Sequence, residues 1–234
     1  MPKLIAIHGK GGAGKSTVAR YVLHRALATG QPVTGFDCDA SNGTLSRFHR
    51  DHTVRTTGEG EAFMKWVESE ILPCAQTGTA VVDLGAGAER TFFEWAASLD
   101  LGEVMAEYGI DVTLLCVLNQ ARDSLVVARA AVTALPTTRH VLVLNHGGSS
   151  TRDDFASIKK HSAWDKLTAD AKHPIVEVPY LPITMVTLDE LNTSFADAAA
   201  GAVKDGAARL GPTDRSRLKV WLRTLDAAFA GILP

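Results

Sequence analysis

The residues with the clearest chemistry form a glycine-rich segment near the N-terminus, GKGGAGKS at positions 9–16. It satisfies the spacing G-x-x-x-x-G-K-[ST], in which the glycines let backbone N–H groups curl around a phosphate. Lys15 supplies a positive charge for the β- and γ-phosphates, and the Ser16 hydroxyl is a magnesium ligand. The segment predicts a site for a nucleoside triphosphate and Mg²⁺. An accidental glycine-rich turn is disfavoured, because the segment lies between an apolar run and an amphipathic stretch.

Three carboxylates follow or end later apolar runs. Asp37 and Asp39 close one run, and Asp83 closes another, in the segment VVDLGAG. Carboxylates at strand ends beside Mg²⁺ and a nucleotide can orient a water molecule and contact the metal region. Gly85 and Gly87 would give the backbone after Asp83 freedom to respond to the γ-phosphate. For the first pair, the alternative of aspartates that only cap a helix or a turn stays open.

These residues are positioned by short apolar runs that alternate with amphipathic stretches. This pattern predicts a parallel sheet covered by helices. The predicted strands cover residues 3–8, 32–38, 80–84, 111–118, 140–145 and 174–178. The predicted helices cover residues 15–28, 61–72, 90–99, 124–135, 155–161, 164–171 and 213–230. The last of these has an amphipathic pattern, and Thr213 or Asp214 can cap its start.

The fold class expected from this order is α/β, a doubly wound, mostly parallel sheet with helices on both faces. The 234 residues contain no repeat, low-complexity tract or obvious linker, so residues 1–234 are predicted to form one domain. Hydrophobic residues make up 46% and charged residues 21%, which excludes a disordered chain.

Charge, cysteine spacing and hydropathy limit the binding partners, metal sites and cellular location that the sequence predicts. The formal net charge is −2, so any contact with DNA or an anionic membrane must come from a local patch. The three cysteines have no C-x-x-C spacing, and the eight histidines show no metal pattern. We found neither a membrane-spanning run nor a signal peptide, and we expect a cytoplasmic protein.

The segment KGGAGKST at positions 10–17 resembles the deviant phosphate-loop motif of the ParA/MinD ATPases. The resemblance implies a P-loop NTPase fold, and a second lysine, Lys10, that reaches the phosphates of a partner in a homodimer formed with ATP. It implies catalytic roles for Lys10 and Lys15. It also implies that the nucleotide is held by Gly11, Gly12, Ala13, Gly14, Lys15, Ser16 and Thr17. The alternative for Lys10 is a solvated surface lysine.

The resemblance extends to later segments. FDCDA at positions 36–40 is similar to the first switch segment of that family, although the usual Pro-Gln after the second aspartate is replaced by Ala40-Ser41. By resemblance, Asp39 positions the attacking water, and Ser16, Asp37 and Asp83 form the metal region. Asn145 and Pro179 match positions where the family recognises adenine. A simple turn role for these two is an equal alternative.

The function implied is a ParA-like ATPase that hydrolyses ATP slowly, as a switch for plasmid partition or conjugal transfer. Its partners would be non-specific DNA and a centromere-binding, transfer or relaxase protein. Positions 201–234 contain six basic and three acidic residues, a local excess of three positive charges. Two alternative hypotheses are a membrane-positioning ATPase of MinD type and an ATP-dependent metabolic ligase related to dethiobiotin synthetase. Membrane binding is less favoured, because an exposed Trp221 and Phe229 would be costly.

Overall fold

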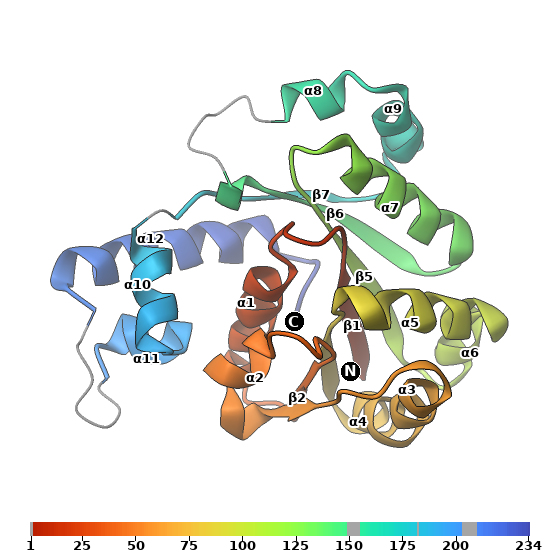
Figure 1. Ribbon diagram of the computed structural model, residues 1–234, viewed down its shortest axis with the longest axis horizontal. Coiled ribbons are helices and arrows are strands. Elements are labelled where there is room, and N and C mark those ends of the chain that lie inside the picture. The colour runs from red at the N-terminus through yellow and green to blue at the C-terminus, as the bar shows by residue number, and fades with distance from the viewer. Residues whose placement is uncertain (1, 149–154, 182, 203–209) are drawn as a thin grey trace.

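The computed structural model describes residues 2–148, 155–181, 183–202 and 210–234. Within these ranges the chain forms a seven-stranded, wholly parallel sheet with the strand order β3-β2-β4-β1-β5-β6-β7 (Figure 1). The strands are β1 (Lys3–His8), β2 (Val33–Asp37), β3 (Thr53–Arg55), β4 (Thr79–Asp83), β5 (Asp111–Leu118), β6 (Arg139–Asn145) and β7 (Ile175–Val178). The predicted doubly wound α/β fold is confirmed.

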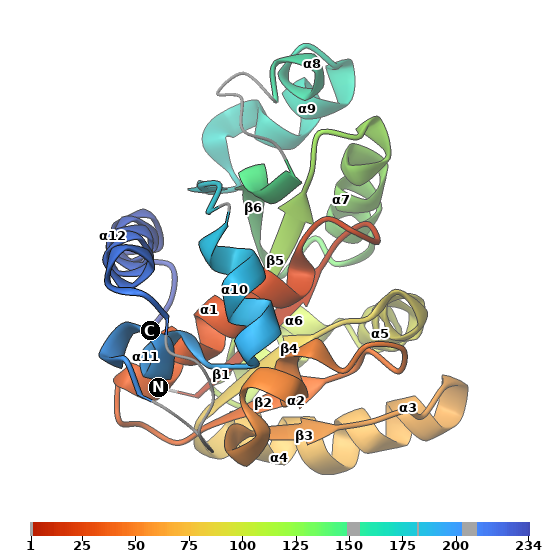
Figure 2. The same cartoon turned by 60° about the vertical axis from the view of Figure 1, so that its left-hand side comes forward.

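Helices cover both faces of the sheet (Figures 1 and 2). Before β5 they are α1 (Lys15–Ala28), α2 (Thr44–Phe48), α3 (Gly60–Trp66), α4 (Leu72–Thr77), α5 (Ala86–Ser98) and α6 (Leu101–Glu107). After β5 they are α7 (Arg122–Ala134), α8 (Ala156–Lys159), α9 (Ser162–Thr168), α10 (Thr184–Leu191), α11 (Phe195–Ala200) and α12 (Pro212–Ala228). A π-helical turn, Val67–Ile71, joins α3 to α4.

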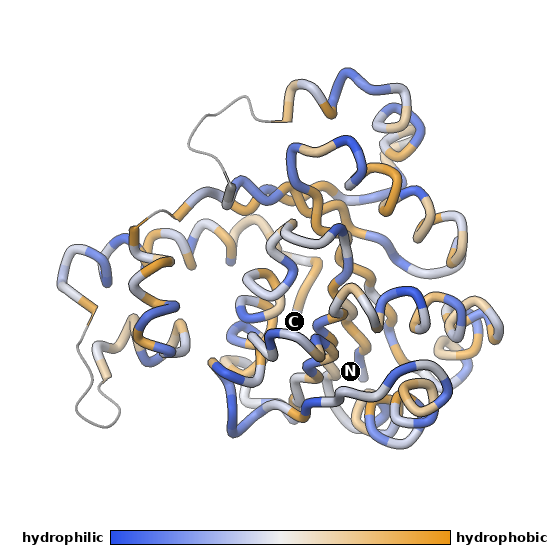
Figure 3. The backbone as a smooth tube through the Cα atoms, in the orientation of Figure 1, coloured by the Kyte–Doolittle hydropathy of each residue, from blue (hydrophilic) through white to orange (hydrophobic). Residues whose placement is uncertain are grey.

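The alternation of side chains along β1 shows how the core divides. Ile5 and Ile7 pack on one face with α1, α11 and α12, whereas Leu4 and Ala6 pack on the other face with α3 to α6. A third cluster lies between β5, β6 and the helices α7 to α9. Strands buried on both faces are almost continuously apolar. In Figure 3 these strands appear as orange segments of the backbone tube at the centre of the molecule.

The structure corrects several predicted boundaries. The strand β3 and the helices α2, α6, α10 and α11 have no counterpart in the sequence prediction. Helix α5 begins at Ala86, not at position 90, so Gly87 lies in its first turn and Gly85 is its N-cap. Helix α12 begins at Pro212 after Gly211, and neither Thr213 nor Asp214 caps it. Of the loosest predicted segment, positions 203–209 lie outside the described residues, as do positions 149–154 of the predicted polar loop.

The apolar stripe of α12 faces the core. Leu218, Trp221, Leu222 and Leu225 are buried against α1, α11 and the sheet. Two polar contacts add to this packing: the Tyr21 hydroxyl donates to Asp226 Oδ1 at 3.0 Å, and Arg25 Nε donates to the Pro234 carbonyl at 2.7 Å. The C-terminal helix is therefore fastened to the helix that follows the glycine-rich segment.

Candidate nucleotide-binding site

The predicted site residues lie at the carboxyl edge of the sheet, in the segments directly beyond it, or in the first turn of α1. The glycine-rich segment follows β1, while Asp37 and Asp83 end β2 and β4 and face each other in register. On the other side of β1, Asn145 ends β6 and pairs with Val178 of β7. Ligands of open α/β sheets bind at this edge, where the strand order reverses.

The glycine-rich segment is a loop that only glycine can form at two positions. Gly14 has φ +90°, and a Cβ there would overlap the side-chain amide of Asn145. Gly9 has φ +141°, and a Cβ there would overlap the Val117 carbonyl. Helix α1 begins directly after Gly14, so its first N–H groups and its positive dipole end face the cavity above the loop.

Lys15 lies inside this loop. Its side chain is buried, and its Nζ donates to the Gly9 carbonyl at 2.8 Å. The ammonium group is thereby held across the loop, where an anion would meet it together with the backbone N–H groups. This is the arrangement that a phosphate-binding lysine needs.

Asp83 is the carboxylate best suited to a metal ion. It is 1% exposed, and its Oδ2 has no hydrogen-bond partner. The pKa of Asp83 is raised to about 7, mainly by burial and also by the nearby Asp37 carboxylate, although a hydrogen bond with Ser16 acts to lower it. A buried carboxylate oxygen without a partner beside a hydroxyl fits a hard cation such as Mg²⁺. Ser16 and Asp83 are therefore the residues that would hold it.

Asp37 has a different set of contacts. Its Oδ2 accepts hydrogen bonds from Ser46 N and Ser46 Oγ, both at 2.8 Å, and its Oδ1 accepts one from Asp39 N at 3.1 Å. The carboxylate thus ties the end of β2 to α2. Its geometry favours a role in anchoring this loop over direct metal ligation.

Asp39 lines a cavity of about 470 Å³ above the loop, together with Lys15, Ser16 and Asp83. Glu59 and the Gly85–Gly87 turn at the start of α5 also line this cavity. Asp39 accepts hydrogen bonds from Ser41 N at 2.9 Å and from Asn42 Nδ2 at 3.2 Å. The cavity has the position and polar lining expected for terminal phosphates and an attacking water molecule.

Lys10 points away from its own phosphate cavity. Its Nζ lies 2.7 Å from Oδ2 of Asp123 in the first turn of α7, and its side chain is 36% exposed. The lysine is the only one of the predicted catalytic residues that does not line the phosphate cavity within the described part of the chain. This placement agrees with a group that acts on another molecule.

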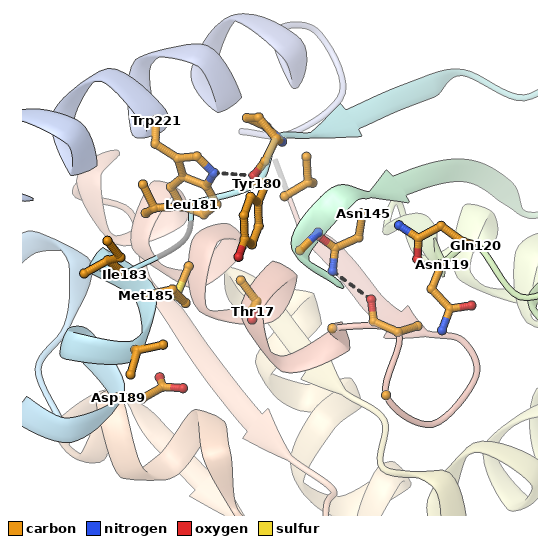
Figure 4. A pocket seen from close by; sticks show the side chains of 17 residues that line it. Thr17, Asn119, Gln120, Asn145, Tyr180, Leu181, Ile183, Met185, Asp189 and Trp221 are labelled. Carbon is orange, nitrogen blue, oxygen red and sulfur yellow. Dashed lines mark hydrogen bonds between the residues drawn. The ribbon is translucent and has the colours of Figure 1, made fainter. Parts of the chain in front are cut away.

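A second cavity, of about 410 Å³, extends from the loop toward α10 and α12 (Figure 4). Asn145 lies in its floor, where Nδ2 donates to the Ala13 carbonyl at 2.8 Å and Oδ1 accepts from Gly147 N at 3.0 Å. Pro179 lies in its wall, and so do Thr17, Tyr180, Leu181, Met185, Asp189 and Trp221. A cavity beside the phosphate loop that is lined by both apolar and polar side chains fits a nucleobase.

Several residues in or beside the two cavities carry no sequence signal. Glu89 accepts a hydrogen bond from Gly9 N at 3.2 Å and so links α5 to the phosphate loop. Asn119 and Gln120 line the base-side cavity after β5, and Asp189 of α10 lines it and pairs with the buried Arg20 of α1 at 2.9 Å. These residues come from segments without a motif, so only the position of each residue could identify them.

His8 and the cysteines take no part in the predicted chemistry. His8 is fully buried beside the loop and meets the Phe93 ring edge-on, with centroids 5.0 Å apart. The three cysteines are free. Among the described residues, no helix is long and apolar enough to cross a membrane, and no cluster of His, Cys, Asp and Glu forms a metal site of three or more ligands.

No protein-family model matches this sequence, and no curated protein matches it. Solved structures do match the fold. The MinC:MinD cell division protein complex of Aquifex aeolicus matches with a TM-score of 0.58 and 14% identity over 99% of this chain and 97% of that chain. MinD of the same organism matches with a TM-score of 0.55 and 14% identity over 94% and 96%.

A third match is a protein of Borrelia burgdorferi B31 described as a plasmid partition protein and bound to AMPPNP. It has a TM-score of 0.51 and 13% identity over 96% of this chain and 98% of that chain. The chain therefore has a P-loop NTPase fold of the kind found in MinD and plasmid partition proteins.

Proposed function

We propose that this chain is a ParA-like ATPase that binds Mg-ATP, dimerises in the ATP state and hydrolyses ATP slowly as a switch. The observation that carries the proposal is the pair of lysines in one phosphate loop. Lys15 is folded across its own loop, whereas Lys10 points outward to α7. A loop with one inward and one outward lysine can neutralise phosphates of two molecules.

Within one molecule, the loop and α1 bind the phosphates, and the base-side cavity takes the adenine. Magnesium would be held by Ser16 and Asp83, and it would neutralise charge that develops on the phosphates. Asp39 orients the attacking water. Asp37 keeps the β2–α2 loop in place through Ser46. Lys10 of one molecule stabilises the transferring phosphoryl group of the other, as an arginine finger does elsewhere.

The output of such an enzyme is the lifetime of its dimer. The solved neighbours include the MinC:MinD cell division protein complex and a protein described as a plasmid partition protein. We therefore infer plasmid partition or conjugal transfer as the process, with a centromere-binding, transfer or relaxase protein as partner and the cytoplasm as the compartment.

Non-specific DNA is the second partner that we infer. On α12, Arg217, Lys219 and Arg223 are exposed, although Arg217 pairs with Asp214 at 3.1 Å. Lys204 and Arg209 of the basic excess lie outside the described residues. One such surface binds phosphates weakly, whereas two in a dimer bind with a steep dependence on salt. DNA binding should then be stronger with ATP than with ADP.

Sedimentation velocity tests the proposal directly. With Mg-ATP the protein should sediment as a dimer and with ADP as a monomer, and Asp39→Ala should accumulate the dimer because it binds ATP and hydrolyses it poorly. Lys10→Ala should bind ATP, remain monomeric and lose turnover. An unchanged mass with ATP, or full activity of monomeric Lys10→Ala, would refute the dimer mechanism.

A metabolic ligase on the same fold would behave differently. It would show turnover that depends on a small carboxylic acid and not on protein concentration. A screen of ATPase activity against small carboxylates, run at two protein concentrations, separates the two functions.

A further inference from the structure

Trp221 joins the C-terminal helix to the base-side cavity. Its indole Nε1 donates a hydrogen bond of 2.7 Å to the carbonyl of Pro179, 42 positions earlier in the chain. Pro179 follows β7, and the next residues, Tyr180 and Leu181, line the cavity (Figure 4). Because an indole has one donor and no acceptor, this is the one conventional hydrogen bond that the side chain can make.

The same indole packs against α1 and α11. Its ring meets Tyr21 of α1 edge-on, with centroids 6.4 Å apart, and Phe195 of α11 at 5.5 Å. Trp221 is 4% exposed, so both contacts are inside the core. One side chain thus touches both the helix that begins at the phosphate loop and the segment that lines the base-side cavity.

The helix that carries Trp221 cannot shift freely along α1. Tyr21 donates its hydroxyl proton to Asp226, and Arg25 Nη1 donates to the Asp226 carbonyl at 2.9 Å. Arg25 also reaches the last carbonyl of the chain, that of Pro234. The indole N–H therefore projects from a fixed helix, and it sets the distance between the Pro179 carbonyl and α1.

We propose that Trp221 is a positioning residue for the nucleobase, which holds the 179–181 segment at the distance from the phosphate loop that an adenine nucleotide requires. This inference rests on the proposed ATPase function and adds a role for α12 in it. Trp221 lines the base-side cavity and holds Pro179 by its hydrogen bond, and it is not among the residues that line the phosphate cavity. Loss of its N–H should weaken binding of the base and leave binding of the phosphates unchanged.

The test compares two ligands, Mg-ATP and Mg-tripolyphosphate, by titration calorimetry. Trp221→Phe keeps a ring in the core and removes the N–H donor. It should raise the Kd for ATP about tenfold, the scale of one hydrogen bond, and leave the Kd for tripolyphosphate unchanged.

Trp95→Phe is the matched control. Trp95 is also 4% exposed and also donates one hydrogen bond from its indole, to Glu68 Oε1 at 3.0 Å, but it lies in the core cluster on the opposite face of the sheet. This variant should lose similar thermal stability and keep both affinities. Equal loss of ATP and tripolyphosphate in Trp221→Phe, or loss of neither, would overturn the positioning role.

A measurement on the unaltered fold covers the case in which Trp221→Phe does not fold. The chain has four tryptophans, and 5-fluorotryptophan labelling gives each a ¹⁹F resonance, which single Phe substitutions of the other three assign by elimination. The Trp221 resonance should shift with ATP and not with tripolyphosphate. If the Trp221 resonance does not shift when ATP binds, this inference is refuted and the proposed function is not. If the wild-type protein binds neither ligand, the proposed function is refuted as well.

Discussion

The ammonium group of Lys10 lies 2.7 Å from the carboxylate of Asp123, although 113 positions separate the two residues. The hydrogen bond with Lys10 and its charge lower the pKa of Asp123. In the single chain, Asp123 is therefore paired with Lys10, the lysine that we expect to act on a second molecule. In the dimer that we propose, Lys10 would have to leave this carboxylate to reach the partner's phosphates.

Asp123→Asn should make this exchange easier. The amide binds an ammonium group more weakly than a carboxylate does, so Lys10 is released more easily. The dissociation constant of the dimer formed with ATP should therefore fall about two- to fivefold, the range expected from loss of an exposed ion pair. Sedimentation equilibrium with ATP at low salt measures the change. Glu177→Gln, which removes an exposed partner of Lys159 at 3.4 Å, should leave dimerisation unaltered. Weaker dimerisation of Asp123→Asn would show that Asp123 belongs to the interface itself.

Gly14→Ala should strongly weaken nucleotide binding. The new methyl group would overlap the Asn145 amide, and φ +90° is strained for alanine. We expect a Kd for ATP raised more than tenfold and a free energy of unfolding lowered by about 1–3 kcal/mol. Gly30→Ala is the control, because Gly30 also has a positive φ of +69°, its Cβ would meet no atom within 4 Å, and it lines neither cavity; this variant should keep its affinity for ATP. Titration calorimetry measures the Kd for ATP of both variants, and urea unfolding measures their stability. A Gly14→Ala protein with normal ATP affinity would contradict the described loop.

Leu225→Ala tests whether the apolar face of α12 belongs to the core. Leu225 is 0% exposed, so truncation should lower the free energy of unfolding by about 2–5 kcal/mol. Val220 on the same helix is 51% exposed, and Val220→Ala should change it by less than about 0.5 kcal/mol. A helix that instead inserts into anionic vesicles would show little cost in solution for Leu225→Ala and a loss of vesicle binding.

His140 should make the protein less stable in acid. Burial lowers the pKa of His140 to about 4, while its ring nitrogen Nε2 lies 2.8 Å from the Leu135 carbonyl. Between pH 6.5 and 4 the unfolded chain binds a proton that the native chain excludes. The stability contributed by neutral His140 is therefore complete above pH 6.5 and is lost as the pH falls toward 4, by at most about 1.4 kcal/mol per pH unit.

Urea unfolding at several pH values measures this slope. Removal of the titrating ring in His140→Gln should make the slope shallower over that interval, whatever the substitution costs at pH 7. Substitution of an exposed histidine, His52→Gln, serves as the comparison and should leave the slope as it is. An unchanged slope in His140→Gln would mean that another buried group, such as His49, whose pKa burial also lowers to about 4, controls acid unfolding.

The six predicted strands are all present, because each is a short apolar run that would be costly to expose and is bounded by a turn or a helix signal. The strand β3 escaped prediction, since its three residues, Thr53–Arg55, are polar or exposed and pair only with β2 at the sheet edge. Helices α10 and α11 also escaped, because each buries only a few residues and has no long apolar period.

The sequence by itself determined the phosphate loop, since glycines, a lysine and a serine at fixed spacing are a local requirement of phosphate binding. It also placed Asp37, Asp83 and Asn145 at one edge, because the carboxyl ends of parallel strands share an edge. Only the tertiary structure decided which of these carboxylates keeps a free oxygen, that Lys10 meets Asp123, and that Trp221 holds Pro179. Those relationships join segments 42 or more positions apart, and their geometry follows from packing of whole helices on the sheet, which no local pattern records.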